Sequence, residues 1–230
     1  MNTFAPTILL TRPEAASYEF ADMLRKSGVG LPILISPVID IEFMYPPSLD
    51  GFQGVLFTSQ NGVAAVPGHA LPAWCVGDVT AKAASSKGWC SKTAAGDAEA
   101  LYRQVLSDSP KGRLMHLRGF HARGKLAERL TCAGIPTTET VVYRQNSKSL
   151  SAEARVLLGE KYPVIIPLFS PRSAEHLMLQ GPIAAPVTII AMSKAVAQEV
   201  ASLKCEKLVL VKKPNAESML SAIIRHLHTY

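Results

Sequence analysis

The sequence predicts an α/β fold made of two related lobes, each built on a parallel sheet. Short apolar runs rich in Ile, Val and Leu, such as residues 8–10 and 164–166, alternate with helical patterns, which is typical of buried parallel strands covered by helices. A series of motifs occurs twice along the chain in the same order. Two extended segments marked by proline, residues 31–47 and 136–147, interrupt the alternation at equivalent places. Together these observations indicate a duplicated α/β unit.

The repeat starts at an arginine that ends an apolar run. The helical pattern after Arg12 stops at Gly28, and Arg118 and Gly134 each stand 106 residues further on. Loop insertions in a duplicated chain keep the order of the repeated motifs and can only increase the spacing between the two copies. The alternative is that any α/β chain gives such echoes by chance. Three further motifs recur with spacings of 112, 116 and 118 residues: 57–59 at 169–171, 77–81 at 193–197, and 97–101 at 215–219.

The individual elements follow from the same patterns. Pro13 suits the first position of a helix over residues 13–27, and Gly28 suits its end. Asn215 suits the cap of a helix over residues 215–227. A third helix is expected over 97–106. We expect strands at 8–10, 33–35, 55–57, 114–117, 141–142, 164–166, 187–190 and 208–211.

The two proline-marked segments are interpreted as paired crossings between the lobes. Both are rich in β-branched residues, which favour extended chain over helix. The linker strands are then expected at residues 33–42 and 137–147. One lobe would combine residues 1–36 with 147–230, and the other would span 40–143.

Composition excludes several classes of function. Among 230 residues, 48% are apolar and 18% charged, no apolar run reaches the length of a membrane span, and the N-terminus lacks a secretory pattern, so we expect a cytoplasmic protein. The four cysteines and six histidines have neither metal-ligand nor disulfide-framework spacing. The net charge of +6 attracts anions, but the basic residues are scattered and aromatics make up only 7%, which argues against nucleic acid.

Hydroxyl residues follow several predicted strands just before a helix. The carboxyl ends of parallel strands are where open α/β sheets bind ligands, and helix N-termini there favour anions. Four such turns at symmetric places indicate a shared anion site; the alternative is that each hydroxyl only caps its helix. The turns are Thr58-Ser59, Gly77 to Thr80, Ser170-Pro171-Arg172-Ser173 and Ser193-Lys194. Dinucleotide, P-loop, zinc-protease and serine-hydrolase signatures are absent.

Three further side chains suit chemistry on an anionic substrate. Arg12 and Arg118 end matching strands, where a guanidinium can clamp a carboxylate; the alternative is exposed surface charge. Tyr143 lies in the second crossing segment and is expected to face the cleft between the lobes. There a tyrosine can give a proton to a leaving oxygen, or it simply packs the linker.

At these residues the chain resembles the uroporphyrinogen-III synthase family, and the matching motifs span nearly the whole chain. The matches are Thr11-Arg12-Pro13, residues 57–63, residues 76–81, Leu117-Arg118-Gly119, Val142-Tyr143-Arg144, residues 169–174 and residues 214–220. The resemblance implies two flavodoxin-like lobes joined by a two-stranded linker. It implies cyclisation of the linear tetrapyrrole hydroxymethylbilane to uroporphyrinogen III, with loss of water and inversion of the last ring. It also implies that no metal and no organic cofactor takes part.

The resemblance implies roles for particular residues. The linker tyrosine, here Tyr143, is the candidate acid, and strand-end hydroxyls together with backbone N–H groups would hold the folded substrate. The full set expected to bind substrate is Arg12, Thr58, Ser59, Thr80, Arg118, Ser170, Arg172, Ser173, Ser193 and Lys194. At residues 193–197 the chain lacks the threonines of the family pattern, so any role that they carry is either lost or has passed to Ser193 and Lys194.

Two other classes of function share some of these features. A two-lobed protein that binds a small anion without chemistry would have the same cleft and turns, because a fold does not fix a function. A nucleic-acid module would account for the positive charge and would show steep salt dependence. Of these classes we expect the enzyme. We expect it to act on a small molecule as a monomer and to bind neither nucleic acid nor a membrane.

Overall fold

The computed structural model describes residues 5–94, 96–121 and 124–227. The chain divides into two units, unit 1 with Met1–Asp40 and Asn146–Tyr230, and unit 2 with Ile41–Gln145. Each unit contains a mainly parallel sheet covered by helices, so the predicted α/β class is confirmed. Within the described part of the chain, no helix has the length and apolar character needed to cross a membrane.

Unit 1 has a five-stranded sheet whose neighbours all run parallel. In chain order its strands lie 2-1-3-4-5 across the sheet, which is the flavodoxin-like arrangement. The spatial order is β11 (Lys207–Leu210), β10 (Val187–Ala191), β9 (Val164–Leu168), β1 (Thr7–Leu10) and β2 (Ile33–Ile35). Its helices are α1 (Glu14–Lys26), α6 (Ala152–Gly159), α7 (Pro171–Met178), α8 (Lys194–Glu199) and α9 (Ala216–Leu227).

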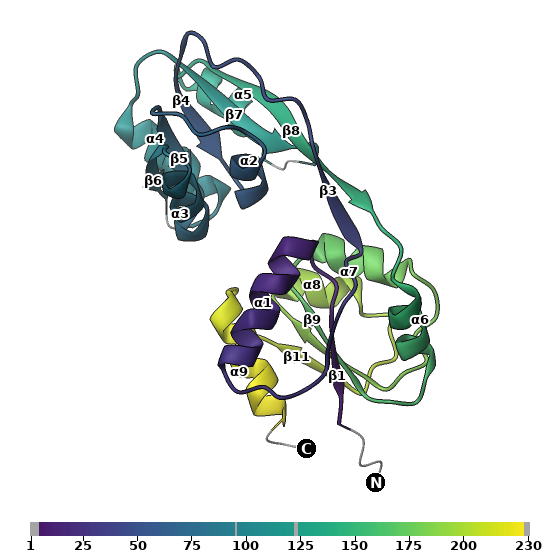
Figure 1. Cartoon of the computed structure of the whole chain (residues 1–230). Helices are drawn as coiled ribbons and strands as arrows, with labels where there is room; N and C mark the ends of the chain where they lie inside the picture. Colours follow the sequence, from purple (N-terminus) through teal and green to yellow (C-terminus); the bar gives the residue numbers. More distant parts are fainter. Residues whose placement is uncertain (1–4, 95, 122–123, 228–230) are drawn as a thin grey trace. The chain divides into compact units, whose positions relative to one another are not determined.

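Helices α1 and α9 pack side by side on one face of this sheet (Figure 1). Phe20 and Leu24 of α1 and Ile223 of α9 are fully buried against alternate strand residues such as Ile8 and Ile190. The intervening strand residues point to the opposite face, because side chains alternate along a strand. Both faces are therefore apolar, as the continuous apolar runs of the sequence require.

Unit 2 has a six-stranded sheet. The spatial order is β3 (Ile39–Phe43), β8 (Thr137–Ser147), β7 (Arg113–Gly119), β4 (Phe52–Phe57), β5 (Pro72–Cys75) and β6 (Cys90–Thr93). Its helices are α2 (Gln60–Ala64), α3 (Asp78–Ser86), α4 (Ala98–Asp108) and α5 (Leu126–Cys132). Strands β8, β7, β4, β5 and β6 lie in the same spatial order as β2, β1, β9, β10 and β11 of unit 1. The repeat seen in the sequence is thus a repeat of strand positions.

Two apolar cores cover the two faces of the unit 2 sheet. Phe57 and Leu117 belong to the core under α2 and α3. Leu56 and Leu114 belong to the core under α4 and α5. Neighbouring residues of one strand therefore lead to different faces, and this alternation decides which polar groups meet at the strand ends.

Strands β3 and β8 carry the chain between the units, and β2 belongs to the sheet of unit 1. The Met44 N–H donates to the Val142 carbonyl at 2.9 Å, and the Lys148 N–H donates to the Val38 carbonyl at 2.9 Å. Residue numbers rise along one strand as they fall along the other, so the two segments run antiparallel.

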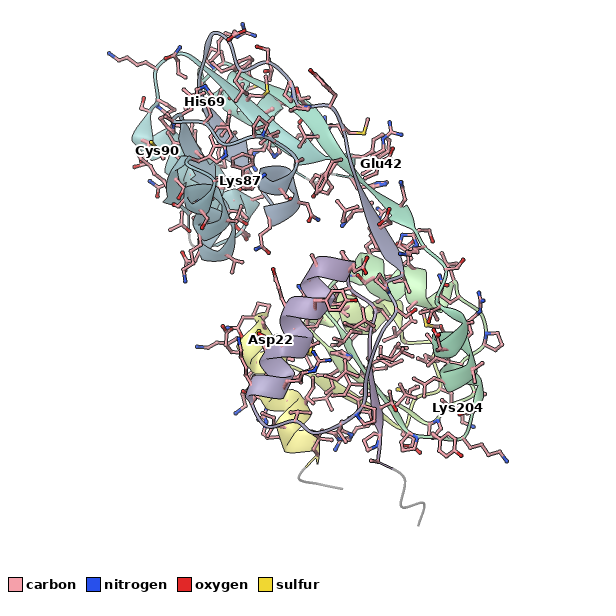
Figure 2. The ribbon with its side chains drawn as sticks, in the orientation of Figure 1. Asp22, Glu42, His69, Lys87, Cys90 and Lys204 are labelled. Atoms are coloured by element: carbon pink, nitrogen blue, oxygen red, sulfur yellow. The ribbon has the colours of Figure 1, made fainter. Side chains whose placement is uncertain are left out.

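Helix ends follow the chemistry that the sequence predicts, with one difference. Asn215 accepts from the Ser218 N–H at 2.9 Å at the start of α9. Pro13 stands at the cap position of α1, one residue before the helical position predicted for it. Lys87, labelled in Figure 2, donates to the carbonyls of Val63 (3.1 Å), Ala64 (2.8 Å) and Val66 (3.0 Å). It satisfies carbonyls that the short helix α2 leaves free at its C-terminal end.

Candidate functional site at the strand ends

The residues singled out from the sequence divide between the units. Unit 2 holds Thr58, Ser59, Thr80, Arg118 and Tyr143, and unit 1 holds Arg12, Ser170, Arg172, Ser173, Ser193 and Lys194. Apart from Tyr143, which lies within β8, these residues lie at the carboxyl ends of strands or in the first turn of the next helix. This is the edge of an open α/β sheet where ligands bind.

Tyr143 and Ser59 are brought together in unit 2. The Tyr143 hydroxyl lies 2.9 Å from Ser59 Oγ, and Tyr143 is only 8% exposed. Ser59 is the cap of α2, where its Oγ accepts the Gly62 N–H at 3.1 Å. Ser59 keeps its proton and a second lone pair, so either oxygen of the pair can be the donor, and the serine can donate to the tyrosine oxygen when that oxygen loses its own proton. The pair is therefore suited to stabilise a tyrosine that gives up its proton.

A bulge and a glycine position the tyrosine ring. The register between β7 and β8 shifts after Arg118, so that Gly119 faces Tyr143 and Val142 is skipped. A Cβ on Gly119 would lie 2.5 Å from Tyr143 Cζ and 2.7 Å from its hydroxyl oxygen. No side chain larger than hydrogen fits there while the ring keeps its place. Bulges are known to re-aim side chains next to functional sites, and Gly119 had no individual role in the sequence interpretation.

Thr58 contacts a buried histidine, His116 of β7, on the face of the sheet opposite to that of Tyr143. Thr58 Oγ1 lies 3.2 Å from His116 Nε2, and His116 is 2% exposed. Burial lowers the pKa of His116 from 6.5 to about 4; Glu139 acts to raise it and Arg118 to lower it. The imidazole is therefore neutral near neutral pH. Sequence patterns did not single out His116, because a lone histidine in an apolar strand is typical of a packed core.

Arg118 has its charge already engaged. Its guanidinium donates to Glu139 at 2.7 Å, to the Gly119 carbonyl at 2.9 Å and to the Phe120 carbonyl at 3.1 Å. Thr80, the remaining predicted residue of unit 2, lies buried in the first turn of α3. The role of Arg118 in binding substrate stays a prediction, and these contacts leave it less available than its position implies.

Arg12 has a different environment at the matching place in unit 1. Its guanidinium carbon lies 3.9 Å from the centre of the Phe169 ring, and the guanidinium donates a long hydrogen bond, 3.5 Å, to the Ala16 carbonyl. Burial lowers the pKa of Arg12, against an opposing effect of Glu19. Among the described residues, no carboxylate lies within ion-pair distance of it. A half-buried guanidinium without a carboxylate is suited to bind an anion.

The hydroxyls of unit 1 cap its helices. Ser170 Oγ accepts the Ser173 N–H at 3.1 Å and lies 2.9 Å from Ser173 Oγ, with Pro171 in the first turn of α7. Ser193 Oγ accepts the Val196 N–H at 3.3 Å at the start of α8. Arg172 is half-buried and Lys194 is exposed, each in the first turn of its helix. Capping and binding are compatible, since the other N–H groups of each first turn stay free.

The part of the chain that the structure describes contains no cluster of side chains that could bind a metal ion. No group of three or more His, Cys, Asp or Glu side chains there is arranged to hold an ion. The candidate residues offer hydroxyls, three arginines (Arg12, Arg118 and Arg172), one lysine (Lys194) and the phenol of Tyr143, together with backbone N–H groups.

The fold and these strand-end groups define a protein of two flavodoxin-like units with polar groups at the switch point of each sheet. The family model described as uroporphyrinogen-III synthase HemD matches residues 18–221. The chain therefore belongs to the uroporphyrinogen-III synthase family. A comparison with curated proteins gives no match.

Solved structures agree with this fold. The uroporphyrinogen-III synthetase of Helicobacter pylori 26695 is similar with a TM-score of 0.69 and 17% identity, over 96% of this chain and 100% of that one. A mutant uroporphyrinogen III synthase from the extremely thermophilic bacterium Thermus thermophilus is similar with a TM-score of 0.55 and 16% identity, over 98% of this chain and 100% of that one. At these identities the likeness shows the fold, and the family assignment rests on the family model.

Proposed function

We propose that Tyr143 is the general acid in a reaction by which this chain converts hydroxymethylbilane to uroporphyrinogen III. The family match over residues 18–221 is the observation that carries the reaction, and it makes the chain an enzyme of tetrapyrrole biosynthesis. The pairing of Tyr143 with Ser59 at 2.9 Å supports the role of the phenol.

The phenol would act at the first step. The Tyr143 proton passes to the terminal hydroxyl of the substrate as its carbon–oxygen bond breaks and water leaves. The pyrrole nitrogen supplies the electron pair, which gives an azafulvenium cation. The Ser59 proton then stabilises the phenolate. The pyrrole ring at the other end of the linear tetrapyrrole attacks this cation to form a spiro intermediate. The intermediate fragments and recloses with the last ring inverted. The final closure releases a proton that restores Tyr143.

The predicted residues of unit 1 would hold carboxylates of the substrate. Arg12 is the strongest candidate, because it is half-buried, lies on Phe169 and has no carboxylate partner among the described residues. Ser170, Ser193 and the free N–H groups beside them offer neutral donors. Lys194 adds an exposed cation at the start of α8. Holding a flexible chain in one folded form is what selects the inverted product over spontaneous closure.

The deciding experiment is a product assay. Hydroxymethylbilane is generated in situ from porphobilinogen, the purified protein is added, and the oxidised uroporphyrins are separated. We expect isomer III to dominate. Isomer I alone, at the rate seen without protein, would overturn the enzyme and leave a small-anion binding protein as the better account.

Tyr143→Phe tests the acid within the same assay. We expect kcat to fall by ~10²- to 10⁴-fold with KM nearly unchanged, because a general acid acts on the transition state. Tyr45→Phe is the matched control, since Tyr45 is 94% exposed. Equal kcat in the two variants would remove the acid role from Tyr143.

We also propose that the enzyme is a cytoplasmic monomer that uses no metal, organic cofactor or nucleic acid. Scattered basic residues and the lack of metal-ligand spacing in the sequence support this. Sedimentation as a single chain, full activity after chelation, and absence of DNA or RNA binding at low salt are the expected results.

A further inference from the structure

The contact between Thr58 and His116 determines which way the threonine hydroxyl is directed. Thr58 Oγ1 and His116 Nε2 are 3.2 Å apart, so one of them donates a proton to the other. The answer depends on which ring nitrogen of the neutral His116 carries hydrogen. If Nε2 is bare, Thr58 donates and keeps both its lone pairs for a ligand. If Nε2 is protonated, Thr58 accepts and keeps its proton.

The surroundings of the other ring nitrogen settle this point. His116 Nδ1 is buried without a hydrogen-bond partner among the described residues, and Glu139 Oε2 lies 4.0 Å from it. A bare Nδ1 would point its lone pair towards a carboxylate, which is repulsive. A protonated Nδ1 places positive hydrogen towards that carboxylate, which is attractive. The geometry therefore favours hydrogen on Nδ1 and a bare Nε2.

We propose that His116 is a positioning residue that accepts a hydrogen bond from the Thr58 hydroxyl, so that Thr58 meets the substrate as an acceptor for a pyrrole N–H. This proposal rests on the proposed function for the identity of the substrate. A carboxylate has only acceptor oxygens and would be repelled by the lone pairs of Thr58. A linear tetrapyrrole has N–H donors as well as carboxylates, and Thr58 is suited to the N–H groups.

The proton position is measured on the protein alone. Two-bond ¹H–¹⁵N correlation spectra of the labelled wild type distinguish protonated from bare ring nitrogens. The His116 signals are assigned by their loss in His116→Gln and by their shift in Thr58→Val, which keeps the histidine. We expect Nδ1 protonated and Nε2 bare. A protonated Nε2 would overturn the proposal, and neither result depends on whether the protein catalyses any reaction.

The ligand group is tested by binding. The probes are a dipyrromethane carrying acetate and propionate side chains and its N-methylated counterpart. We expect wild type to prefer the N–H probe by about fivefold, the range of one neutral hydrogen bond. Thr58→Val should abolish this preference and Thr58→Ser should keep it. A preference that survives in Thr58→Val would contradict the acceptor role.

Activity separates this proposal from the function on which it rests. In the product assay, Thr58→Val should raise KM more than it lowers kcat, and Thr58→Ser should restore KM. If the wild type gives only isomer I, the proposed enzymatic activity is wrong, but the measured tautomer of His116 still stands. Wild type giving isomer III, with unchanged KM in Thr58→Val, would remove Thr58 from substrate binding and leave the enzyme standing.

Discussion

The carboxyl ends of β1 and β7 occupy the same place in the two units, yet their arginines differ in availability. Arg118 donates to Glu139 at 2.7 Å and to two backbone carbonyls. Arg12 rests on the Phe169 ring and has no carboxylate partner in the described part of the chain. The two units share the position of the positive charge but differ in the contacts that the charge makes.

The neighbouring strand explains the difference. The residue two before each arginine shares its face of the sheet. In unit 2 this residue is His116, which pairs in register with Glu139 of β8. In unit 1 it is Leu10, which pairs with Ile35 of β2. The polar pair of His116 and Glu139 supplies the carboxylate that binds Arg118. The apolar pair of Leu10 and Ile35 supplies no carboxylate to Arg12.

The largest effect should come from acidifying unit 2, where the polar pair includes a buried histidine. The His116 pKa falls from 6.5 to about 4 on folding, through burial, with Glu139 opposing and Arg118 adding to the shift. Between these values the unfolded chain binds a proton that the folded chain does not. Folding with a neutral His116 therefore costs nothing above pH 6.5. As the pH falls from 6.5 towards 4, protonation of the unfolded chain progressively lowers the free energy of unfolding. We expect a loss of about 2 kcal/mol by roughly pH 5.

Tryptophan fluorescence measures this loss for unit 2 alone, because Trp74 and Trp89 both lie there. Urea unfolding is compared near pH 7 and pH 5. His116→Leu, which copies the Leu10 of unit 1, should remove most of the difference. His121→Gln is the control, since His121 is an exposed histidine of the same unit whose ring contacts Phe120 and neither tryptophan. A loss that persists in His116→Leu would assign the acid sensitivity to other groups.

The second effect separates the two arginines. Arg12→Gln should raise KM by about tenfold, because a hydrogen bond between charged groups in a half-buried place is lost. Arg118→Gln should change KM by less than about threefold, since its charge is balanced by Glu139. Steady-state kinetics on hydroxymethylbilane measure both, with circular dichroism to confirm the fold. Equal increases would mean that Arg118 leaves Glu139 to bind substrate.

Parts of this comparison could be predicted from the sequence and parts could not. The α/β class, the matching places of Arg12 and Arg118, and the cap at Asn215 follow from local patterns, which a single sequence contains. The engagement of Arg118 depends on which strand lies beside β7 and in what register, and no local pattern specifies either. The need for Gly119 depends on a bulge that brings the Tyr143 ring against it.

The smallest effect tests the explanation by transferring the acidic partner to unit 1. Ile35→Glu places a carboxylate at the register position of Leu10, as Glu139 stands opposite His116. If the neighbouring strand determines availability, the new carboxylate engages Arg12 and KM rises by about fivefold over Ile35→Gln, the range of a partly exposed ion pair. Ile35→Gln controls for the lost apolar packing. Adding Arg12→Gln to each variant should erase the difference between Ile35→Glu and Ile35→Gln, since the coupling requires both charges. A difference that remains without the guanidinium would come from repulsion between the new carboxylate and the substrate, and the availability of Arg12 would then need another cause than its neighbours.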